Sequence, residues 1–380
     1  MTQKLSCKRS VLLILITLLL FFNASLAAED LITITTHDGL ELVGKLDLPD
    51  QKPIPAVVLF IHGSGPNTYQ NHRSYGEIEF NYFDLFAQEF NKRGIAFFRY
   101  NTRGTKIGNN PPYYDQVDRD LYQTNLPLNQ VRDIEAMLRY LKMLEPLAEA
   151  KVYLLGWSEG TILAPMVVER GKVEVDALLL AGYVHDTLFE AIRWQNSGAS
   201  SMLFYKKYFD QDGDGIISSE EYEKDPYQII PTVFNGAKFA EIDQNGDNIL
   251  TNDDFKILLQ PRLTRLLAAI DNGEDDWIWN NYFRATSAWF KAHFELESNH
   301  KRLLKLALPI YIFHGEDDQH VPVEGALEIE KKFENQGKEN INVYVFKGHD
   351  HDLNYTTWPL QGEISAGLKA IFEYAEKLSH

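Results

Sequence analysis

The chain has 380 residues with 54 acidic and 37 basic side chains, which gives a formal net charge of −17. Its hydrophobic fraction of 44% argues against intrinsic disorder, and its acidity argues against nucleic acid as the main partner. The single cysteine, Cys7, excludes a disulfide framework and a cysteine-based metal site.

Residues 1–27 have the pattern of a secretory signal peptide. Three basic residues precede an apolar run at residues 11–22, and small residues follow at the offsets for cleavage after Ala27. A helix of this run would rise roughly 18 Å, less than the ~30 Å hydrocarbon core, which favours cleavage over a retained membrane anchor. We therefore expect a secreted or periplasmic mature protein with no stable membrane span.

Short apolar runs then alternate with helix-like stretches. Two β-rich segments, 31–35 and 40–48, flank Asp38-Gly39, which is a hairpin signal. Buried strands are expected at residues 56–61, 95–100, 152–156, 175–181, 308–313 and 341–346. Helices are expected at residues 80–92, 128–144, 161–170, 323–333 and 363–378. This alternation predicts an α/β fold whose mostly parallel central sheet is covered by helices on both faces.

The alternation stops between residues 184 and 300, a stretch that is rich in aromatic and acidic side chains. Because it is neither Gly/Ser-rich nor low in complexity, we interpret it as a helical insertion into an α/β domain. That domain then comprises residues 28–183 and 301–380. The aromatic residues of the insertion belong to its own core or line an apolar acyl pocket: Trp194, Phe204, Tyr205, Trp277, Trp279, Tyr282, Phe283 and Trp289.

A strand-to-helix turn carries the candidate nucleophile, Ser158. The sequence Gly156-Trp157-Ser158-Glu159-Gly160 fits the pattern G-x-S-x-G, follows an apolar strand and opens a helix. Its glycines are needed because side chains beside the serine would collide in so tight a turn. The first amides of the new helix would face an oxyanion formed there.

The insertion contains a complete EF-hand loop at residues 210–221. Carboxylates stand at positions 1, 3 and 5, a glycine at position 6 allows the turn, and a glutamate at position 12 can bind with both oxygens. The predicted calcium ligands are Asp210, Asp212, Asp214, Ile216 through its carbonyl, Ser218 and Glu221.

A second loop, residues 243–254, departs from the pattern at two positions. Asn248 replaces the turn glycine, at modest cost because asparagine tolerates a left-handed backbone, and Asp254 is one methylene shorter than glutamate. The candidate ligands are Asp243, Asn245, Asp247, Ile249, Thr251 and Asp254. The alternative is a structural partner loop that binds no metal, so we expect one or two Ca2+ ions.

A catalytic serine needs a base and an acid, in the chain order serine, acid, histidine. The loop after residues 308–313 offers Asp317 and Asp318, and the loop after residues 341–346 offers His349 and His351. Both loops follow the carboxyl ends of predicted strands, where an open α/β sheet places its site.

On these motifs the chain resembles the α/β-hydrolase superfamily of serine esterases, thioesterases, lipases and some peptidases. The family's H-G-x-x-D-x-x-V-P loop maps its acid onto Asp318, and its G-x-x-H pattern maps the histidine onto His351. The resemblance also implies an oxyanion hole formed by the amides of Glu159 and of Ser64, which lies in His62-Gly63-Ser64-Gly65-Pro66. In a stretch that resembles the family's R-Y-D-x-R-G, Asn101 replaces the acid.

These features predict a serine hydrolase with the triad Ser158, His351 and Asp318 that acts on small-molecule acyl esters or thioesters through an acyl-enzyme. Calcium is expected to order the insertion, which would form a cap over the site. The alternatives are a peptidase on the same scaffold and a catalytically silent calcium-binding protein.

Overall fold

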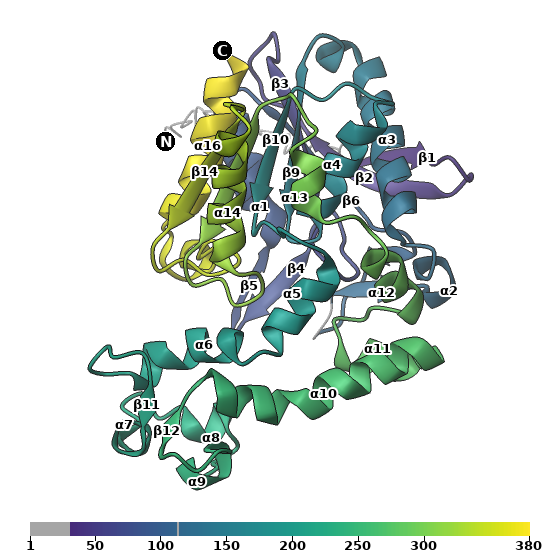
Figure 1. Cartoon of the computed structure of the whole chain (residues 1–380). Coiled ribbons are helices and arrows are strands. Elements are labelled where there is room, and N and C mark those ends of the chain that lie inside the picture. Colours follow the sequence, from purple (N-terminus) through teal and green to yellow (C-terminus); the bar gives the residue numbers. More distant parts are fainter. Residues whose placement is uncertain (1–30, 112–113) are drawn as a thin grey trace, which may run out of the picture. The chain divides into compact units, whose positions relative to one another are not determined.

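Eight strands of the computed structural model form one sheet in the order β1-β2-β6-β3-β9-β10-β13-β14 (Figure 1). The pairs β1–β2 and β2–β6 are antiparallel, and the pairs from β6 across to β14 are parallel. The strands are β1 (Leu31–Thr35), β2 (Glu41–Asp47), β3 (Ala56–Ile61), β6 (Ala96–Tyr100), β9 (Lys151–Trp157), β10 (Ala177–Ala181), β13 (Ile310–Gly315) and β14 (Ile341–Phe346).

The structure describes residues 31–111 and 114–380. The predicted signal peptide, residues 1–27, lies outside the described residues. Within the described part of the chain, no helix combines the length and apolar character needed to cross a membrane.

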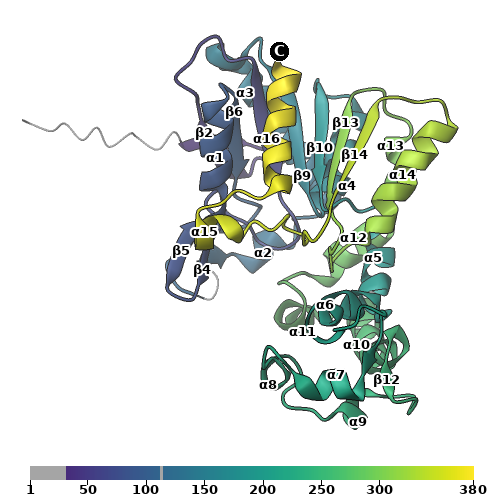
Figure 2. The ribbon, with the colours of Figure 1, turned by 90° about the vertical axis from the view of Figure 1, so that its left-hand side faces the viewer.

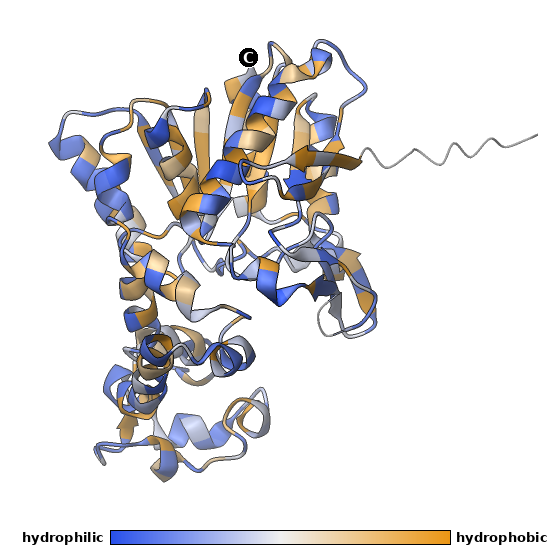
Figure 3. Ribbon diagram, turned by 90° about the vertical axis from the view of Figure 1, so that its right-hand side faces the viewer, coloured by the Kyte–Doolittle hydropathy of each residue, from blue (hydrophilic) through white to orange (hydrophobic). Residues whose placement is uncertain are grey.

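Helices cover both faces of the sheet (Figure 2). One face packs against α3 (Pro127–Met143), α4 (Gly160–Arg170) and α14 (Val323–Asn335), and the other against α1 (Tyr82–Lys92) and α16 (Ala366–Ser379). Side chains along β3 alternate between the two cores, since successive residues of a strand point to opposite faces. The side chains that point to each of the two cores are apolar, which explains why the strands are coloured mainly as hydrophobic in Figure 3.

These observations confirm the predicted α/β fold with its mostly parallel sheet. The strands expected at residues 31–35, 56–61 and 341–346 have those bounds, and the others differ by one to two residues at one or both ends. Two short hairpins were not predicted because their strands are polar: β4 (His72–Tyr75) with β5 (Ile78–Asn81), and β7 (Thr105–Ile107) with β8 (Asp115–Val117). Three further short helices are α2 (Arg119–Tyr122), η1 (Glu145–Leu147) and α15 (Thr357–Gln361).

The segment between β10 and β13 is mainly helical and includes a separate small core. In that core Phe209 and Tyr222 stack with ring centroids 5.3 Å apart, and Ile217 and Leu250 are fully buried. The elements of the segment are α5 (Leu188–Gln195), α6 (Ala199–Phe209), β11 (Ile217–Ser218), α7 (Ser219–Lys224), α8 (Ile230–Val233), α9 (Phe239–Ile242), β12 (Ile249–Leu250), α10 (Asn252–Asn272), α11 (Asp275–Asn281), α12 (Ser287–Phe294) and α13 (Asn299–Leu303).

Candidate active site

Ser158 lies in a strained turn between β9 and α4. Its φ of +53° is in the left-handed region, which an L-residue adopts only at a cost. A Cβ added at Gly160 would collide with the carbonyl oxygen of Ile61 and lie 3.0 Å from that of His62. The glycine therefore lets α4 start directly against β3, and the turn holds Ser158 at the carboxyl end of the sheet.

Asp318, which is fully buried, and His351, which is partly buried, form a hydrogen-bonded pair. Nδ1 of His351 lies 2.7 Å from Oδ2 of Asp318, whose Oδ1 accepts the amides of His320 at 2.8 Å and Val321 at 2.9 Å. Burial raises the pKa of Asp318, but His351 and these donors outweigh it and lower the value to about 2. Asp318 is therefore a carboxylate that fixes the orientation of the imidazole.

The same pair changes the basicity of His351. Burial lowers the pKa of the imidazole, whereas the charge and hydrogen bond of Asp318 raise it, and the net result is a pKa above the ordinary value of 6.5. Because a carboxylate only accepts, Nδ1 carries the proton, and Nε2 of the neutral ring is left as the basic atom.

The two neighbouring candidates have other partners. Asp317 forms an ion pair with Lys207, whose Nζ lies 2.7 Å from Oδ2. Nδ1 of His349 lies 3.0 Å from the carbonyl oxygen of Lys347. In the structure, the acid and histidine that meet are therefore Asp318 and His351.

Ser158 and His351 line one cavity of about 610 Å³, together with residues of the insertion. Within residues 31–111 and 114–380, no hydrogen bond joins the Ser158 hydroxyl to His351, so proton transfer requires them to approach. Hydrogen bonds of this kind are often long in the absence of substrate. Of the aromatic residues proposed for the pocket, Tyr282 and Phe283 line this cavity and the others do not.

The loop that contains Ser64 packs directly against the serine turn. A Cβ added at Gly63 would lie 3.3 Å from the Cβ of Ser158. The side-chain amide of Asn67 holds the loop by donating to the carbonyl oxygens of Gly63 at 3.1 Å and Gly65 at 2.9 Å. The predicted oxyanion donors, Ser64 and Glu159, thus belong to segments on either side of Ser158.

Asn101 stabilises the loop after β6 without a carboxylate. Its Oδ1 accepts the backbone amide of Tyr69 at 2.8 Å, and both residues are buried. An amide oxygen is sufficient for this neutral hydrogen bond. The presence of Asn101 in place of the family's aspartate is therefore compatible with the local fold.

The first predicted calcium loop brings its carboxylates together. One ligand oxygen from each of Asp210, Asp212 and Asp214 lies within 4.8 Å of the others. Glu221 turns back to accept the amides of Gln211 at 2.8 Å and Ser218 at 2.9 Å, and Ile216 precedes the short strand β11. This arrangement of oxygen ligands fits a calcium ion.

The second loop has the same conformation. Asn248 has a φ of +65°, as expected for a residue in place of the turn glycine, and Asp243 accepts the amides of Gly246 and Asn248. Asn245 donates to Asp247 at 2.9 Å, and Asp254 accepts the amide of Thr251 at 2.9 Å. Residue Ile249 pairs with Ser218 between β12 and β11, so the two loops lie side by side.

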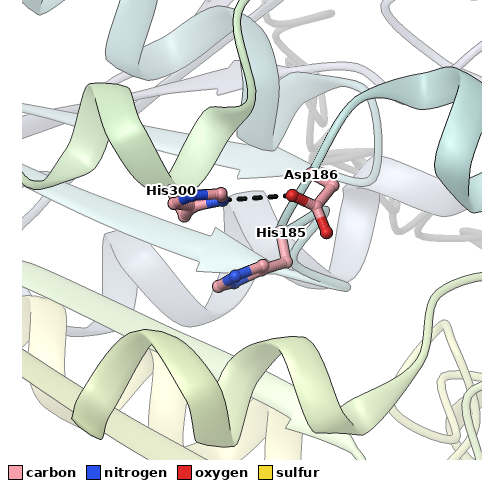
Figure 4. Close-up of side chains that lie close together, drawn as sticks. All are labelled: His185, Asp186 and His300. Atoms are coloured by element: carbon pink, nitrogen blue, oxygen red, sulfur yellow. Dashed lines mark ion pairs between the residues drawn. The ribbon is translucent and has the colours of Figure 1, made fainter. Parts of the chain in front are cut away.

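A histidine cluster joins the two ends of the insertion (Figure 4). Nδ1 of His300 lies 3.1 Å from Asp186, and the rings of His185 and His300 stack 4.6 Å apart with planes inclined by 17°. Nearly parallel rings do not direct their nitrogen lone pairs to one point, so a shared metal ion would require a ring rotation. We interpret the cluster as a structural contact.

Residues 56–356 match the sequence model of a family described as alpha/beta hydrolase fold. The chain belongs to this family. Over 135 residues it is 33% identical to Esterase EstD from Thermotoga maritima, and the alignment covers 35% of this chain. The chain spans about 28% of the length of that curated relative.

A solved structure shows that the fold is shared. A thermostable carboxyl esterase from Bacillus coagulans, solved in complex with glycerol, has a TM-score of 0.52 at 14% identity, covering 92% of this chain and 98% of its own. An esterase from Exiguobacterium antarcticum has a TM-score of 0.47 at 16% identity, covering 92% of this α/β-hydrolase and 99% of its own chain.

Sequence reasoning missed the surroundings of Glu159. Glu159 was expected to supply a backbone amide. Its buried side chain also accepts hydrogen bonds from Gln130, Trp289 and His293. An acidic residue directly after the serine was the one signal that could have indicated an unusual environment, since a carboxylate beside an oxyanion needs partners.

Proposed function

We propose that the protein is a secreted or periplasmic serine esterase that cleaves carboxylic ester or thioester bonds through an acyl-enzyme. The observation that carries this proposal is the Asp318–His351 hydrogen bond, whose imidazole lines the same cavity as Ser158 in its strained turn. A carboxylate, an imidazole and a serine in this relationship are the parts of acyl transfer.

Each residue has a defined role in this mechanism. Nε2 of His351 takes the proton of the Ser158 hydroxyl as its oxygen attacks the acyl carbonyl, and later returns a proton to the leaving group. Asp318 keeps the proton on Nδ1 and stabilises the imidazolium that forms. The amides of Ser64 and Glu159 would bind the oxyanion, and water then releases the acyl group.

The cavity supports a small-molecule acyl substrate. Its wall on the insertion side includes Leu188, Ala191 and Ile192 of α5, which are apolar and mostly buried. At about 610 Å³ it has the size of a pocket for a small ligand, typically ~300–1,000 Å³. The Thermotoga maritima relative is named as an esterase, which agrees with an ester substrate.

We further propose that the loops at residues 210–221 and 243–254 bind calcium and that the ion stabilises the insertion. The ligands would be those predicted from the sequence, and the close carboxylates of Asp210, Asp212 and Asp214 support this assignment. A bound divalent cation neutralises their mutual repulsion. The repulsion otherwise acts on the loop between α6 and α7.

Fluorophosphonate labelling tests the hydrolase proposal. The wild-type protein should be labelled and should turn over p-nitrophenyl or thioester substrates, whereas Ser158→Ala should do neither while unfolding at the same temperature. Peptide substrates in the same panel separate an esterase from a peptidase. A calcium-loaded wild-type protein that neither labels nor hydrolyses any of them would contradict the proposal.

A further inference from the structure

The carboxylate of Glu159 is buried where three elements meet. Its Oε1 lies 2.8 Å from Nε2 of Gln130 in α3, 3.1 Å from Nε1 of Trp289 and 2.9 Å from Nε2 of His293. Trp289 and His293 both belong to α12 of the insertion. Glu159 is 3% exposed and His293 is fully buried, so water does not compete for these bonds.

The donors keep this carboxylate ionised. Burial raises the pKa of Glu159, but the interaction with His293 and the hydrogen bonds from His293 and Gln130 outweigh it, so the pKa lies below its usual value. Since a carboxylate can only accept, each of these groups donates to it.

The insertion also contacts the Ser64 side of the hole. A Cβ added at Gly65 would lie 3.1 Å from the carbonyl oxygen of Phe283, so the backbones of the two loops are in close contact. Phe283 and Arg284 both have positive φ values, 33° and 55°, in the connection that leads to α12. Residues 283–293 therefore contact both loops that flank Ser158.

We propose that Glu159 is a positioning residue through which α12 of the insertion holds the Glu159 amide in the geometry of an oxyanion hole, while Phe283 packs against the loop that contains Ser64. This inference rests on the proposed serine hydrolase function. It assigns the insertion a part in the chemistry of the site, in addition to covering the cavity. We call the group formed by Glu159, Gln130, Trp289 and His293 the Glu159 brace.

Two physical effects of replacing Glu159 have opposite signs. Removing a negative charge beside the hole would favour an oxyanion and raise the rate. Replacing the carboxylate by an amide weakens the charge-assisted hydrogen bonds from Gln130, Trp289 and His293. This would loosen the turn that carries the Glu159 amide and lower the rate, because oxyanion donors must lie within about 2.7–3.1 Å of the oxyanion. The direction of the change in Glu159→Gln therefore decides between an electrostatic bystander and a positioning residue.

The test measures ester turnover, inhibition by a trifluoromethyl ketone and thermal unfolding in the full chain. The ketone forms a tetrahedral adduct with the serine whose oxygen occupies the hole, so its affinity reports donor geometry. In Glu159→Gln we expect kcat to fall about 10- to 100-fold and the inhibition constant to rise by the same factor, with KM changed less than about threefold. Trp289→Phe, which deletes one donor, should give a smaller loss of the same kind.

Glu135→Gln is the matched control. Glu135 is also a buried carboxylate, 4% exposed, and it accepts a 2.6 Å hydrogen bond from Arg170 away from the cavity. Its substitution should lower the unfolding temperature without changing kcat or the inhibition constant. A merely structural Glu159 would behave in the same way.

Four outcomes are decisive. Parallel losses in kcat and inhibitor affinity support the brace, and unchanged or raised values in Glu159→Gln overturn it. If Glu159→Gln does not fold, kcat and the inhibition constant of Trp289→Phe decide between the same two results. A wild-type protein that neither labels with a fluorophosphonate nor turns over esters overturns the proposed function and the brace with it.

Discussion

Nζ of Lys207 in α6 lies 2.7 Å from Oδ2 of Asp317, the residue directly before the candidate catalytic acid. This ion pair connects the insertion to the loop after β13. Asp318, next in the chain, is fully buried and bonds to the imidazole. Two adjacent aspartates therefore have different partners, which predicts different functions.

Substitution of each aspartate should separate these functions. Asp318→Asn should lower kcat by about 10²- to 10⁴-fold, because the asparagine amide cannot hold the same tautomer of His351. Asp317→Asn removes only a partly exposed ion pair, worth about 0–1 kcal/mol, and should keep kcat near the wild-type value. Steady-state ester kinetics check both. A larger loss in Asp317→Asn would mean that the acid is misassigned.

Calcium removal should destabilise the insertion. Chelation should lower the unfolding temperature, and readdition of calcium should restore it, since an ion that binds only the folded state stabilises by about 2.7 kcal/mol at 100 times its Kd. The first loop should account for most of this effect because Glu221 reaches further than Asp254. Differential scanning fluorimetry with calcium, magnesium and chelator measures it.

The matched variants are Glu221→Gln and Glu220→Gln. Glu220 is the neighbouring exposed residue and pairs with Lys224 at 2.9 Å, so its substitution should leave the calcium response intact. Glu221→Gln should abolish most of that response. The calcium proposal is contradicted if chelation changes neither the unfolding temperature nor the ester turnover of the wild-type protein.

The pH dependence of kcat/KM should report His351. The imidazole acts as a base only when neutral, so activity is lost as pH falls through its pKa. Asp318 raises that pKa above 6.5, so the midpoint of the acidic limb should lie above 6.5. In Asp318→Asn the midpoint should move to lower pH, because the stabilisation of the imidazolium is gone.

His349→Gln serves as the control for this profile. His349 is partly buried and its Nδ1 lies 3.0 Å from the carbonyl oxygen of Lys347, so its removal should leave the midpoint unchanged. The assignment of His351 as the base fails if the wild-type midpoint lies at or below 6.5, or if it shifts in His349→Gln and not in Asp318→Asn.

The sequence allowed the sheet and the position of the site to be predicted because both depend on local patterns. Residues 56–61 are entirely apolar, as a strand buried on both faces must be, and the glycines around Ser158 are required by a backbone that leaves no room for side chains. The polar hairpin β4–β5 has no such pattern and was missed.

The Glu159 brace could not be predicted from local patterns either. Glu159 and His293 are 134 residues apart in the chain, and neither lies in a motif that implies the other. Their contact exists because α12 packs against α3 and beside the serine turn, which is a property of tertiary packing. Long-range pairs of buried polar groups require the fold to be known first.

A second buried polar network provides a stability prediction that is independent of catalysis. Arg103, 1% exposed, makes two 2.6 Å hydrogen bonds to Asp133 of α3, and a further one of 2.6 Å to Asp38 between β1 and β2. Asp133 is 3% exposed, whereas the side chain of Asp38 is 42% exposed. The two carboxylates thus hold the same guanidinium from very different environments.

Asp133→Asn should lower the free energy of unfolding by about 3–5 kcal/mol, because it breaks a buried pair and leaves the guanidinium partly uncompensated. Asp38→Asn should cost about 1 kcal/mol or less, since water can replace an exposed carboxylate. Urea unfolding of both variants and the wild-type protein measures the difference. Equal losses in the two variants would show that burial does not set the strength of this network, and the contribution of the Arg103–Asp133 pair would then have to be assigned differently.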